Sequence, residues 1–281
     1  MSPIQKFMKL GEVAARFPGV EFRADVGDEA LVFVKSNHHD VFGPEVVGLD
    51  AMRETNTIRV VEVVGCGASD NGEFVLVLEL IRWQMPGREL PSGFFQRFAR
   101  QLAEMHRAGT SQCFGFKQDN FLGASHQPNS WSENWTEFWA ESRLGYQLKL
   151  ARDNGRGGAE LQKLGAGLIS RLDSRLGYAS QRPSLIHGDL WGGNWICDRD
   201  GQPVLIDPAA YYADREAEFG MTTLFPSLPQ LFYDAYNEAW PMAEGWQDRV
   251  AIYRLYHLLN HLNLFGGSYL AECLKILWRF N

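Results

Sequence analysis

Two carboxylates and one amide occur in this sequence at a spacing that suits phosphoryl transfer. Asp189 follows His187 and Gly188, Asn194 comes five residues later, and Asp207 ends an apolar run eighteen residues after Asp189. A carboxylate can accept the proton of an attacking hydroxyl, which suits Asp189. A second carboxylate and an amide oxygen are hard ligands of the kind that Mg²⁺ prefers, which suits Asp207 and Asn194. The alternative is a pair of turn-capping residues in a β-hairpin.

A lysine and a glutamate earlier in the chain strengthen the first interpretation. The spacing described above parallels the catalytic loop of kinases, H-R-D-x₄-N, and the metal-binding Asp that follows it, and in those enzymes a strand lysine contacts the nucleotide phosphates. Lys35 ends an apolar strand pattern here, and Glu45 lies ten residues on, at the start of a helix pattern. We expect Glu45 to form an ion pair with Lys35. Taken alone, Lys35 could be a solvated strand end, and Glu45 a first-turn residue favoured by the helix dipole.

Strands and one helix in the first eighty residues must position this lysine and glutamate. β-branched and aromatic runs predict strands at residues 30–35, 59–64 and 74–80, the second ending at Gly65. Pro44, near the start of an apolar pattern of helical period, predicts a helix that opens at Gly43. Residues 70–72, Asp-Asn-Gly, predict a hairpin turn.

The rest of the chain has a helical pattern. Apolar spacing predicts helices at residues 94–105, with Ser92 as the cap, and at 134–150, 159–177 and within 230–278. Short strands are expected at residues 185–186 and 203–206. This change of pattern divides the chain into a nucleotide-binding part, residues 1–82, and a catalytic and substrate-binding part, residues 83–281.

Composition excludes several other classes of protein. With 45% hydrophobic and 22% charged residues over 281 positions, the chain is not disordered throughout. Its net charge of −7 lacks the basic footprint of a nucleic-acid-binding protein. Four widely spaced cysteines, no apolar signal segment and no apolar run long enough for a bilayer indicate a soluble, reduced, cytoplasmic protein. We therefore expect neither nucleic acid nor membrane as a partner.

Several short stretches resemble the fructosamine kinase (ketosamine-3-kinase) family, within the wider protein-kinase-like group that includes aminoglycoside phosphotransferases and choline kinases. The stretch from His187 to Asn194 is the most telling, because it contains the insert Leu-Trp-Gly-Gly. The other stretches that carry the resemblance are residues 33–37, 42–45, 55–60, 114–116, 127–129, 135, 207–209, 211–212, 214–216 and 256–261. Together they extend over about residues 30–270.

The resemblance implies an α+β, two-lobed, protein-kinase-like fold with a small antiparallel β-rich N-terminal lobe and a larger, mainly helical C-terminal lobe. It implies that the γ-phosphate of ATP is transferred, with Mg²⁺, to the 3-hydroxyl of a ketose attached to an amine. The substrate would be a small-molecule or protein-bound ketosamine, whose amine is freed after phosphorylation. Lys35 would orient phosphates, Glu45 would position Lys35, Asp189 would be the base, and Asn194 and Asp207 would hold the metal.

Further residues are candidates for binding nucleotide or sugar. Glu79 and Ile81 lie where a kinase-like hinge would offer backbone groups to adenine, although they could simply end a buried strand. Trp191, inside the insert, could be a platform for a sugar ring or a packing residue.

Two other groups of side chains have similar alternatives. The acidic cluster Asp214, Glu216 and Glu218 could attract the cationic amine of a sugar–lysine adduct, or cap a helix. His257 and His261 share a helix face and are candidates for the substrate wall. They could equally be core histidines, and the glutamate of a zinc-binding H-E-x-x-H motif is absent.

One stretch departs from the family pattern. The family usually has a glycine-rich turn shortly before the strand lysine, but this chain has only Gly11, Gly19 and Gly27 there. A backbone cradle over the phosphates is therefore in question. We expect either another turn over ATP or modest nucleotide affinity. A cysteine sometimes found in that turn is also missing, so thiol-based redox control is not expected there.

Two rival functions remain after this comparison. One is a kinase of the same fold that acts on another alcohol, such as an aminoglycoside or a choline-like substrate. The other is a catalytically silent pseudokinase that only binds a partner.

Overall fold

An antiparallel sheet forms the first part of the molecule. The computed structural model describes residues 4–82, 90–177, 182–225 and 228–281. The sheet order is β1-β2-β5-β4, and every neighbouring pair is antiparallel. Its strands are β1 (Ile4–Lys9), β2 (Leu31–Asn37), β4 (Val63–Ala68) and β5 (Phe74–Glu79). The β-branched and aromatic residues of β2 and β5 suit a sheet that is covered on both faces.

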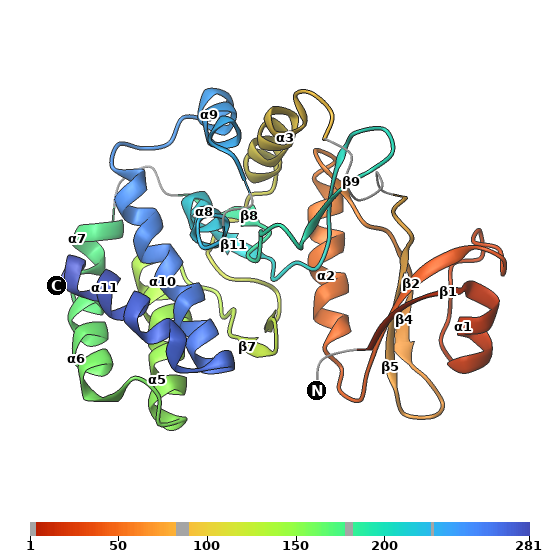
Figure 1. Ribbon diagram of the computed structural model, residues 1–281, viewed down its shortest axis with the longest axis horizontal. Helices are drawn as coiled ribbons and strands as arrows, with labels where there is room; N and C mark the ends of the chain where they lie inside the picture. Colours follow the sequence, from red (N-terminus) through yellow and green to blue (C-terminus); the bar gives the residue numbers. More distant parts are fainter. Residues whose placement is uncertain (1–3, 83–89, 178–181, 226–227) are drawn as a thin grey trace.

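Each face of this sheet is covered by a helix. On the outer face, α1 (Leu10–Arg16) and the chain after it bury Val13 and Phe17 against Val34. On the inner face lies α2 (Phe42–Glu54), whose Leu49 and Met52 join the main core. Figure 1 shows α1 at the outer end of the molecule and α2 between the sheet and the helical half. The inner face is therefore the one that meets the rest of the protein.

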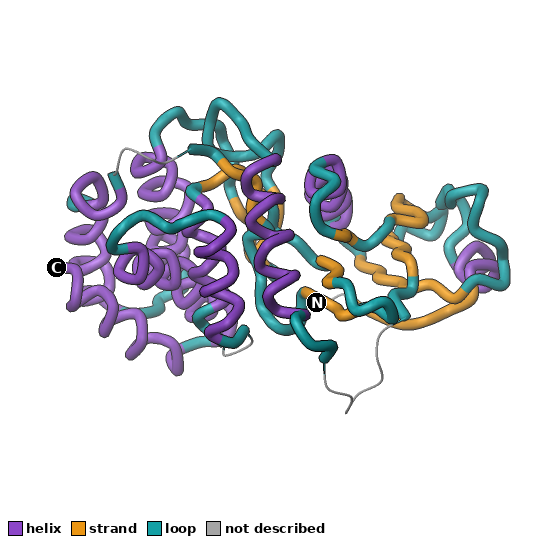
Figure 2. Tube along the Cα trace, turned by 90° about the horizontal axis from the view of Figure 1, so that it is seen from above, coloured by secondary structure: helices purple, strands orange, loops and turns teal. Residues whose placement is uncertain are grey.

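Helices make up most of the second half of the chain. Figure 2 shows them gathered on one side of the molecule, away from the main sheet. They are α3 (Phe94–Ala108), α4 (Trp135–Phe138), the π-helix η1 (Trp139–Gly145), α5 (Tyr146–Asp153), α6 (Gly158–Ile169), α7 (Leu172–Leu176), the 3₁₀-helix η2 (Arg215–Ala217), α8 (Glu218–Thr222), α9 (Gln230–Ala239), α10 (Trp246–Phe265), the 3₁₀-helix η3 (Gly267–Tyr269) and α11 (Leu270–Phe280). Throughout the described ranges, every helix is too short or too polar to cross a membrane.

The remaining strands are short and pair outside the main sheet. They are β3 (Arg59–Val60), β6 (Asn120–Leu122), β7 (Ser125–Gln127), β8 (Ser184–Ile186), β9 (Trp195–Cys197), β10 (Pro203–Leu205) and β11 (Tyr211–Ala213). β9 and β10 form an antiparallel hairpin, and β3 pairs with β10 in parallel. The first half of the chain is thus tied directly to the hairpin that separates Asn194 from Asp207.

Most predicted elements are confirmed, but the expected strand at residues 59–64 is two strands. β3 leaves the main sheet to pair with β10, and β4 begins only at Val63. The expected end at Gly65 is also wrong, because β4 continues through it. A side chain at Gly65 would collide with the ring of Phe22, which bridges to this residue. Gly65 therefore permits a close approach of two segments and does not end the strand.

Helix boundaries account for the remaining differences. The first eighty residues were expected to hold one helix, and α1 is a second. α3 has Gly93 as its N-cap, at φ 74°, where Ser92 was expected. The predicted helix at 134–150 contains a π-helical turn, and the one at 159–177 is broken near Ser170. The predicted division after residue 82 adjoins residues 83–89, which lie outside the described residues, so the two parts 1–82 and 83–281 stay a prediction.

Candidate active site

The β9–β10 hairpin brings the three predicted catalytic and metal residues together. Asn194 directly precedes β9, and Asp207 follows β10 after one residue. The amide nitrogen Nδ2 of Asn194 donates to Oδ2 of Asp189 at 3.0 Å and to its carbonyl oxygen at 2.8 Å. The same nitrogen lies 3.4 Å from the carbonyl oxygen of Asp207. Asp207 has a φ of 54°, an uncommon conformation for a residue other than glycine that is often found at functional sites.

Lys35 joins this group from the sheet. Its Nζ atom lies 2.7 Å from Oε1 of Glu45 and 2.7 Å from Oδ1 of Asp207, and the side chain is only 3% exposed. Burial alone would lower the pKa of Lys35, but the two carboxylates outweigh it and raise that pKa. Burial raises the pKa of Glu45 to about 7, with Lys35 opposing the shift. The predicted ion pair is therefore present, and Lys35 is a cation at neutral pH.

The environment of Asp189 also perturbs its carboxyl group. Burial, together with the charges of Asp207 and Glu218, raises its pKa well above the ordinary range, although the hydrogen bond from Asn194 opposes the shift. A raised pKa makes a carboxylate a better proton acceptor near neutral pH. Lys35 contacts two carboxylates, those of Glu45 and Asp207. Asp189 joins the same group of residues through Asn194, so the group contains more carboxyl groups than cations.

Glu218 holds the backbone of the loop that presents Asp189. Its carboxylate accepts hydrogen bonds from the backbone nitrogens of His187, at 2.6 Å, and Gly188, at 3.0 Å. His106 lies 3.3 Å from the same carboxylate, and its other ring nitrogen is 2.8 Å from the hydroxyl of Tyr236. Burial alone would raise the pKa of Glu218, but the contacts with His106 and His187 lower it. Glu218 is thus a fixed anion beneath the loop, a role that its place in an acidic cluster did not reveal.

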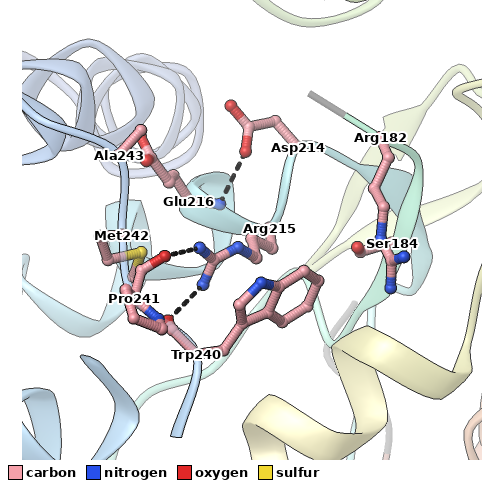
Figure 3. A pocket seen from close by; sticks show the side chains of 9 residues that line it. All are labelled: Arg182, Ser184, Asp214, Arg215, Glu216, Trp240, Pro241, Met242 and Ala243. Atoms are coloured by element: carbon pink, nitrogen blue, oxygen red, sulfur yellow. Dashed lines mark hydrogen bonds between the residues drawn. The ribbon is translucent and has the colours of Figure 1, made fainter. Parts of the chain in front are cut away.

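The other two acidic residues of that cluster point elsewhere. Asp214 caps η2 by accepting from the Glu216 backbone at 3.0 Å, and it accepts from the Tyr253 hydroxyl at 2.7 Å. Glu216 forms a two-point ion pair with Arg249, at 2.7 and 2.9 Å. Figure 3 shows both lining a small pocket with Arg215. This pocket holds about 160 Å³, and none of the catalytic or metal candidates lines it. The geometry favours the capping alternative over attraction of a substrate amine.

Trp191 and His261 belong to one aromatic wall. Phe225 joins them, with ring centroids 5.9 Å from Trp191 and 5.6 Å from His261, and Tyr269 lies 5.1 Å beyond His261. Trp191 remains 39% exposed, so its indole is open to a ligand. A side chain at Gly193 would collide with that indole. The glycine of the insert therefore lets the ring fold back beside the loop. Phe225 carried no signal in the sequence.

His257 occupies a different environment from its neighbour on α10. It is only 3% exposed and packs against the ring of Tyr256. Burial lowers its pKa to about 3. The ring nitrogen Nδ1 of His261 donates to the backbone oxygen of His257 at 2.7 Å. The His257 side chain is thus buried beside Tyr256, whereas His261 faces the aromatic wall.

The two hinge candidates lie at the end of β5. The Oε2 atom of Glu79 is 2.8 Å from Arg59, and its Oε1 atom accepts from the Glu62 backbone at 3.0 Å. Arg59 also pairs with Asp198 of the β9–β10 hairpin, at 2.6 Å. The Glu79 side chain therefore ties the sheet to the second half of the protein, and its backbone nitrogen donates to the Glu62 oxygen at 2.9 Å. Ile81 is buried in the main core.

A buried arginine supports the segment after Asp207 and was not predicted. The Arg143 guanidinium lies 3.9 Å from the ring centroid of Tyr211 and donates to Asn129 at 2.7 Å. The side-chain amides of Asn129 and Gln127 both donate to Oδ1 of Asn120. Asn120 in turn donates through Nδ2 to the Ala210 oxygen at 2.8 Å, and Gln127 donates through Nε2 to the Ala209 oxygen at 3.1 Å. This network fixes the backbone that follows Asp207.

Comparisons with known proteins identify the family of this chain. A family model for fructosamine kinase matches residues 20–280. A protein from Synechocystis, named a probable ketoamine kinase, is 41% identical over 89% of this chain and 85% of its own length. A chloroplastic protein-ribulosamine 3-kinase from Arabidopsis thaliana is 42% identical over 89% of this chain and 76% of its own length.

The fold comparison leads to the same conclusion. The crystal structure of a protein assigned as a fructosamine-3-kinase from Haemophilus somnus has a TM-score of 0.81 and 29% identity. The match covers 97% of this chain and 96% of the other. The predicted α+β, two-lobed, protein-kinase-like fold is thereby confirmed. By sequence match and by fold, the chain belongs to the fructosamine kinase family.

Proposed function

We propose that this protein transfers the γ-phosphate of ATP to the 3-hydroxyl of a ketosamine, in a reaction that needs Mg²⁺. The observation that carries the proposal is the convergence of Lys35, Asp189, Asn194 and Asp207 from three segments of the chain. The relatives named ketoamine kinase and protein-ribulosamine 3-kinase support the choice of substrate class.

Each residue of the site has a distinct role in this proposal. Lys35 contacts the phosphates of ATP, and Glu45 holds Lys35 in place. Asp189, with its raised pKa, accepts the proton of the attacking hydroxyl. Because phosphoryl transfer needs little covalent help from the protein, positioning and charge account for most of the rate. The hinge backbone at Glu79 and Ile81 would face the adenine.

The donor set of the site fits Mg²⁺. The Asp207 carboxylate and the amide oxygen of Asn194 would hold the ion, and both are hard oxygen ligands. The described ranges hold no cluster of three or more His, Cys, Asp or Glu side chains able to bind a metal. Phosphates and water would therefore complete the shell, as is usual for this ion. When bound, Mg²⁺ supplies charge neutralisation on the phosphates.

The aromatic wall is the candidate site for the sugar and its amine. Trp191 lies two residues after Asp189, so a ketose held against its indole would have a hydroxyl near that carboxylate. Phe225 and His261 extend the wall. We propose that the substrate is a free or protein-bound ketosamine, met in the cytoplasm.

A turnover assay against a panel of substrates tests this function. ATP consumption would be measured with fructosyl-, ribulosyl- and erythrulosyl-amines, an aminoglycoside and choline. Trp191→Ala should impair ketosamine turnover more than basal ATP hydrolysis. Trp131→Ala, at another exposed tryptophan, is the control. Rapid phosphorylation of choline or the aminoglycoside, with every ketosamine left unchanged, would select the rival substrate class. ATP binding without any turnover would select the pseudokinase.

A further inference from the structure

The glycine-poor segment before the strand lysine lies on the wrong face of the sheet to cover phosphates. Leu10, Val13 and Phe17 of this segment pack in the outer core with Val34. Lys35 is the next residue after Val34 and points to the opposite face, where it meets Glu45 of α2. Within residues 4–35, no glycine-rich hairpin stands between the start of the sheet and Lys35. A different element must therefore cover a nucleotide on the inner face.

The edge strand β1 places an exposed aromatic ring on that inner face. Phe7 is directly opposite Phe33 in the β1–β2 ladder, and the two rings are 5.3 Å apart at 50°. Residues directly opposite each other point to the same side of a sheet. Because side chains alternate along a strand, Phe33 and Lys35 also share a face. Phe7 is 63% exposed, whereas Phe33 is half-buried.

Phe33 lies between Lys35, the lysine proposed to contact the phosphates, and the hinge candidates at the end of β5. One two-residue step along β2, about 6.6 Å, separates the Phe33 level from the Lys35 level. The step leads toward the hinge, because Val32, the next residue along β2, is paired with Glu79 of β5. Leu78 of β5 is opposite Phe33 and continues the apolar surface. On the inner face Phe33 thus lies between Lys35 and the hinge, and Phe7 flanks Phe33 on the edge strand.

We propose that Phe7 and Phe33 form an aromatic roof that stacks on the adenine of ATP, so that nucleotide affinity does not depend on a glycine-rich turn over the phosphates. This inference rests on the proposed function only in requiring that the protein binds ATP. Every nucleobase has a π-face, and removing one stacked aromatic side chain typically weakens binding by about tenfold. A roof of this kind contacts the base and leaves the triphosphate to Lys35.

Calorimetry with two ligands tests the roof. The dissociation constants of MgATP and of magnesium tripolyphosphate, which has no base, would be measured on the wild-type protein and on Phe7→Ala, Phe7→Tyr and Trp278→Ala. Trp278 is a comparably exposed aromatic residue, 57% exposed, on α11. We expect Phe7→Ala to weaken MgATP by about tenfold and to leave tripolyphosphate unchanged. Phe7→Tyr and Trp278→Ala should bind both ligands as the wild type does.

Three results would overturn the roof. One is a Phe7→Ala protein that binds MgATP with unchanged affinity. Another is an equal loss of affinity for MgATP and tripolyphosphate, which would indicate a general disturbance of the sheet. The third is a change of oligomeric state in size-exclusion chromatography with no change in MgATP affinity, which would assign Phe7 to pairing of the β1 edge with a second copy. These measurements need no ketosamine, so they are independent of whether the proposed reaction occurs.

Discussion

The Nζ atom of Lys35 lies 2.7 Å from Oδ1 of Asp207, although 172 residues separate the two in the chain. Lys35 belongs to the main sheet, and Asp207 follows the β9–β10 hairpin of the second half. The ion pair therefore closes the space between the halves at the point where ATP phosphates are proposed to lie. The same contact leaves Asp207 with a second oxygen for a metal.

Replacing Asp207 by Asn should raise the Mg²⁺ concentration needed for half-maximal activity by at least about tenfold. The substitution keeps the size of the side chain but removes the charge that attracts the ion. Titration of kinase activity with Mg²⁺ measures the shift. Asp200→Asn, at an exposed residue in the turn of the same hairpin, should leave the titration unchanged. Full wild-type activity in excess chelator would contradict the metal assignment.

Asp189→Ala should reduce kcat by about 10²- to 10⁴-fold, because a positioned proton acceptor typically contributes that much. ATP binding should change little, since Asp189 bonds to Asn194 and not to Lys35 in the structure. Rapid-quench kinetics and calorimetry with MgATP would separate the two effects. A variant with near-normal turnover would show that another group accepts the proton.

Glu218→Gln should lower kcat with little change in the KM for ATP. Each oxygen of the carboxylate accepts a hydrogen bond from one backbone nitrogen of the Asp189 loop. In glutamine one of these oxygens is replaced by an NH₂ group, which would face a backbone N–H donor and could not accept from it. The effect would act through the loop, so Glu218 is a positioning residue. Glu137→Gln, at an exposed glutamate on α4, is the control. Equal changes in kcat and in the KM for ATP, or a loss of stability with wild-type kcat, would contradict this role.

The free energy of unfolding should fall as the pH drops from about 6.5 toward 3. Burial lowers the pKa of His257 to about 3, while an unfolded histidine titrates near 6.5. Between these values the unfolded state binds a proton that the folded state excludes, so acid favours unfolding. Within that window, each drop of one pH unit should lower the free energy of unfolding by about 1.4 kcal/mol through this histidine. Above the window the histidine is neutral in both states and causes no loss.

His257→Gln isolates this contribution. Urea unfolding at pH 7.5, 6.0 and 5.0 should give a shallower loss of stability for the variant than for the wild-type protein. Parallel curves for the wild-type protein and His257→Gln would mean that His257 does not resist protonation in the folded state.

The local sequence was enough to predict that several candidate residues of the site lie together. Lys35 and Glu45 were recognisable because a strand pattern and a helix pattern met at a fixed spacing, and the structure pairs them. Asp189, Asn194 and Asp207 lie on one loop and one hairpin, so their spacing is local and their meeting follows from it. The strands, α2 and the main helices were predictable from hydrophobic period for the same reason.

Long-range contacts decided what could not be predicted. Glu218 meets the Asp189 loop across 30 residues, and Phe225 meets both Trp191 and His261, so neither has a local signature. Asp214, a candidate for attracting the substrate amine, caps η2 and accepts from the Tyr253 hydroxyl, and His257, a candidate for the substrate wall, is buried. The contact with Tyr253 and the burial of His257 depend on distant parts of the chain, and the two substrate roles stay predictions. The course of residues 10–20 across the outer face depends on core packing, which no turn motif indicates.

Identification of the phosphorylated atom tests the central claim most directly. Wild-type protein would be incubated with MgATP and a fructosyl-lysine derivative, and the product would be examined by ¹H–³¹P correlation NMR. The account predicts phosphate on O3 of the ketose, followed by slow release of the free amine. Phosphate on O1 or O6, or an unmodified ketosamine in a preparation that phosphorylates another alcohol rapidly, would contradict it.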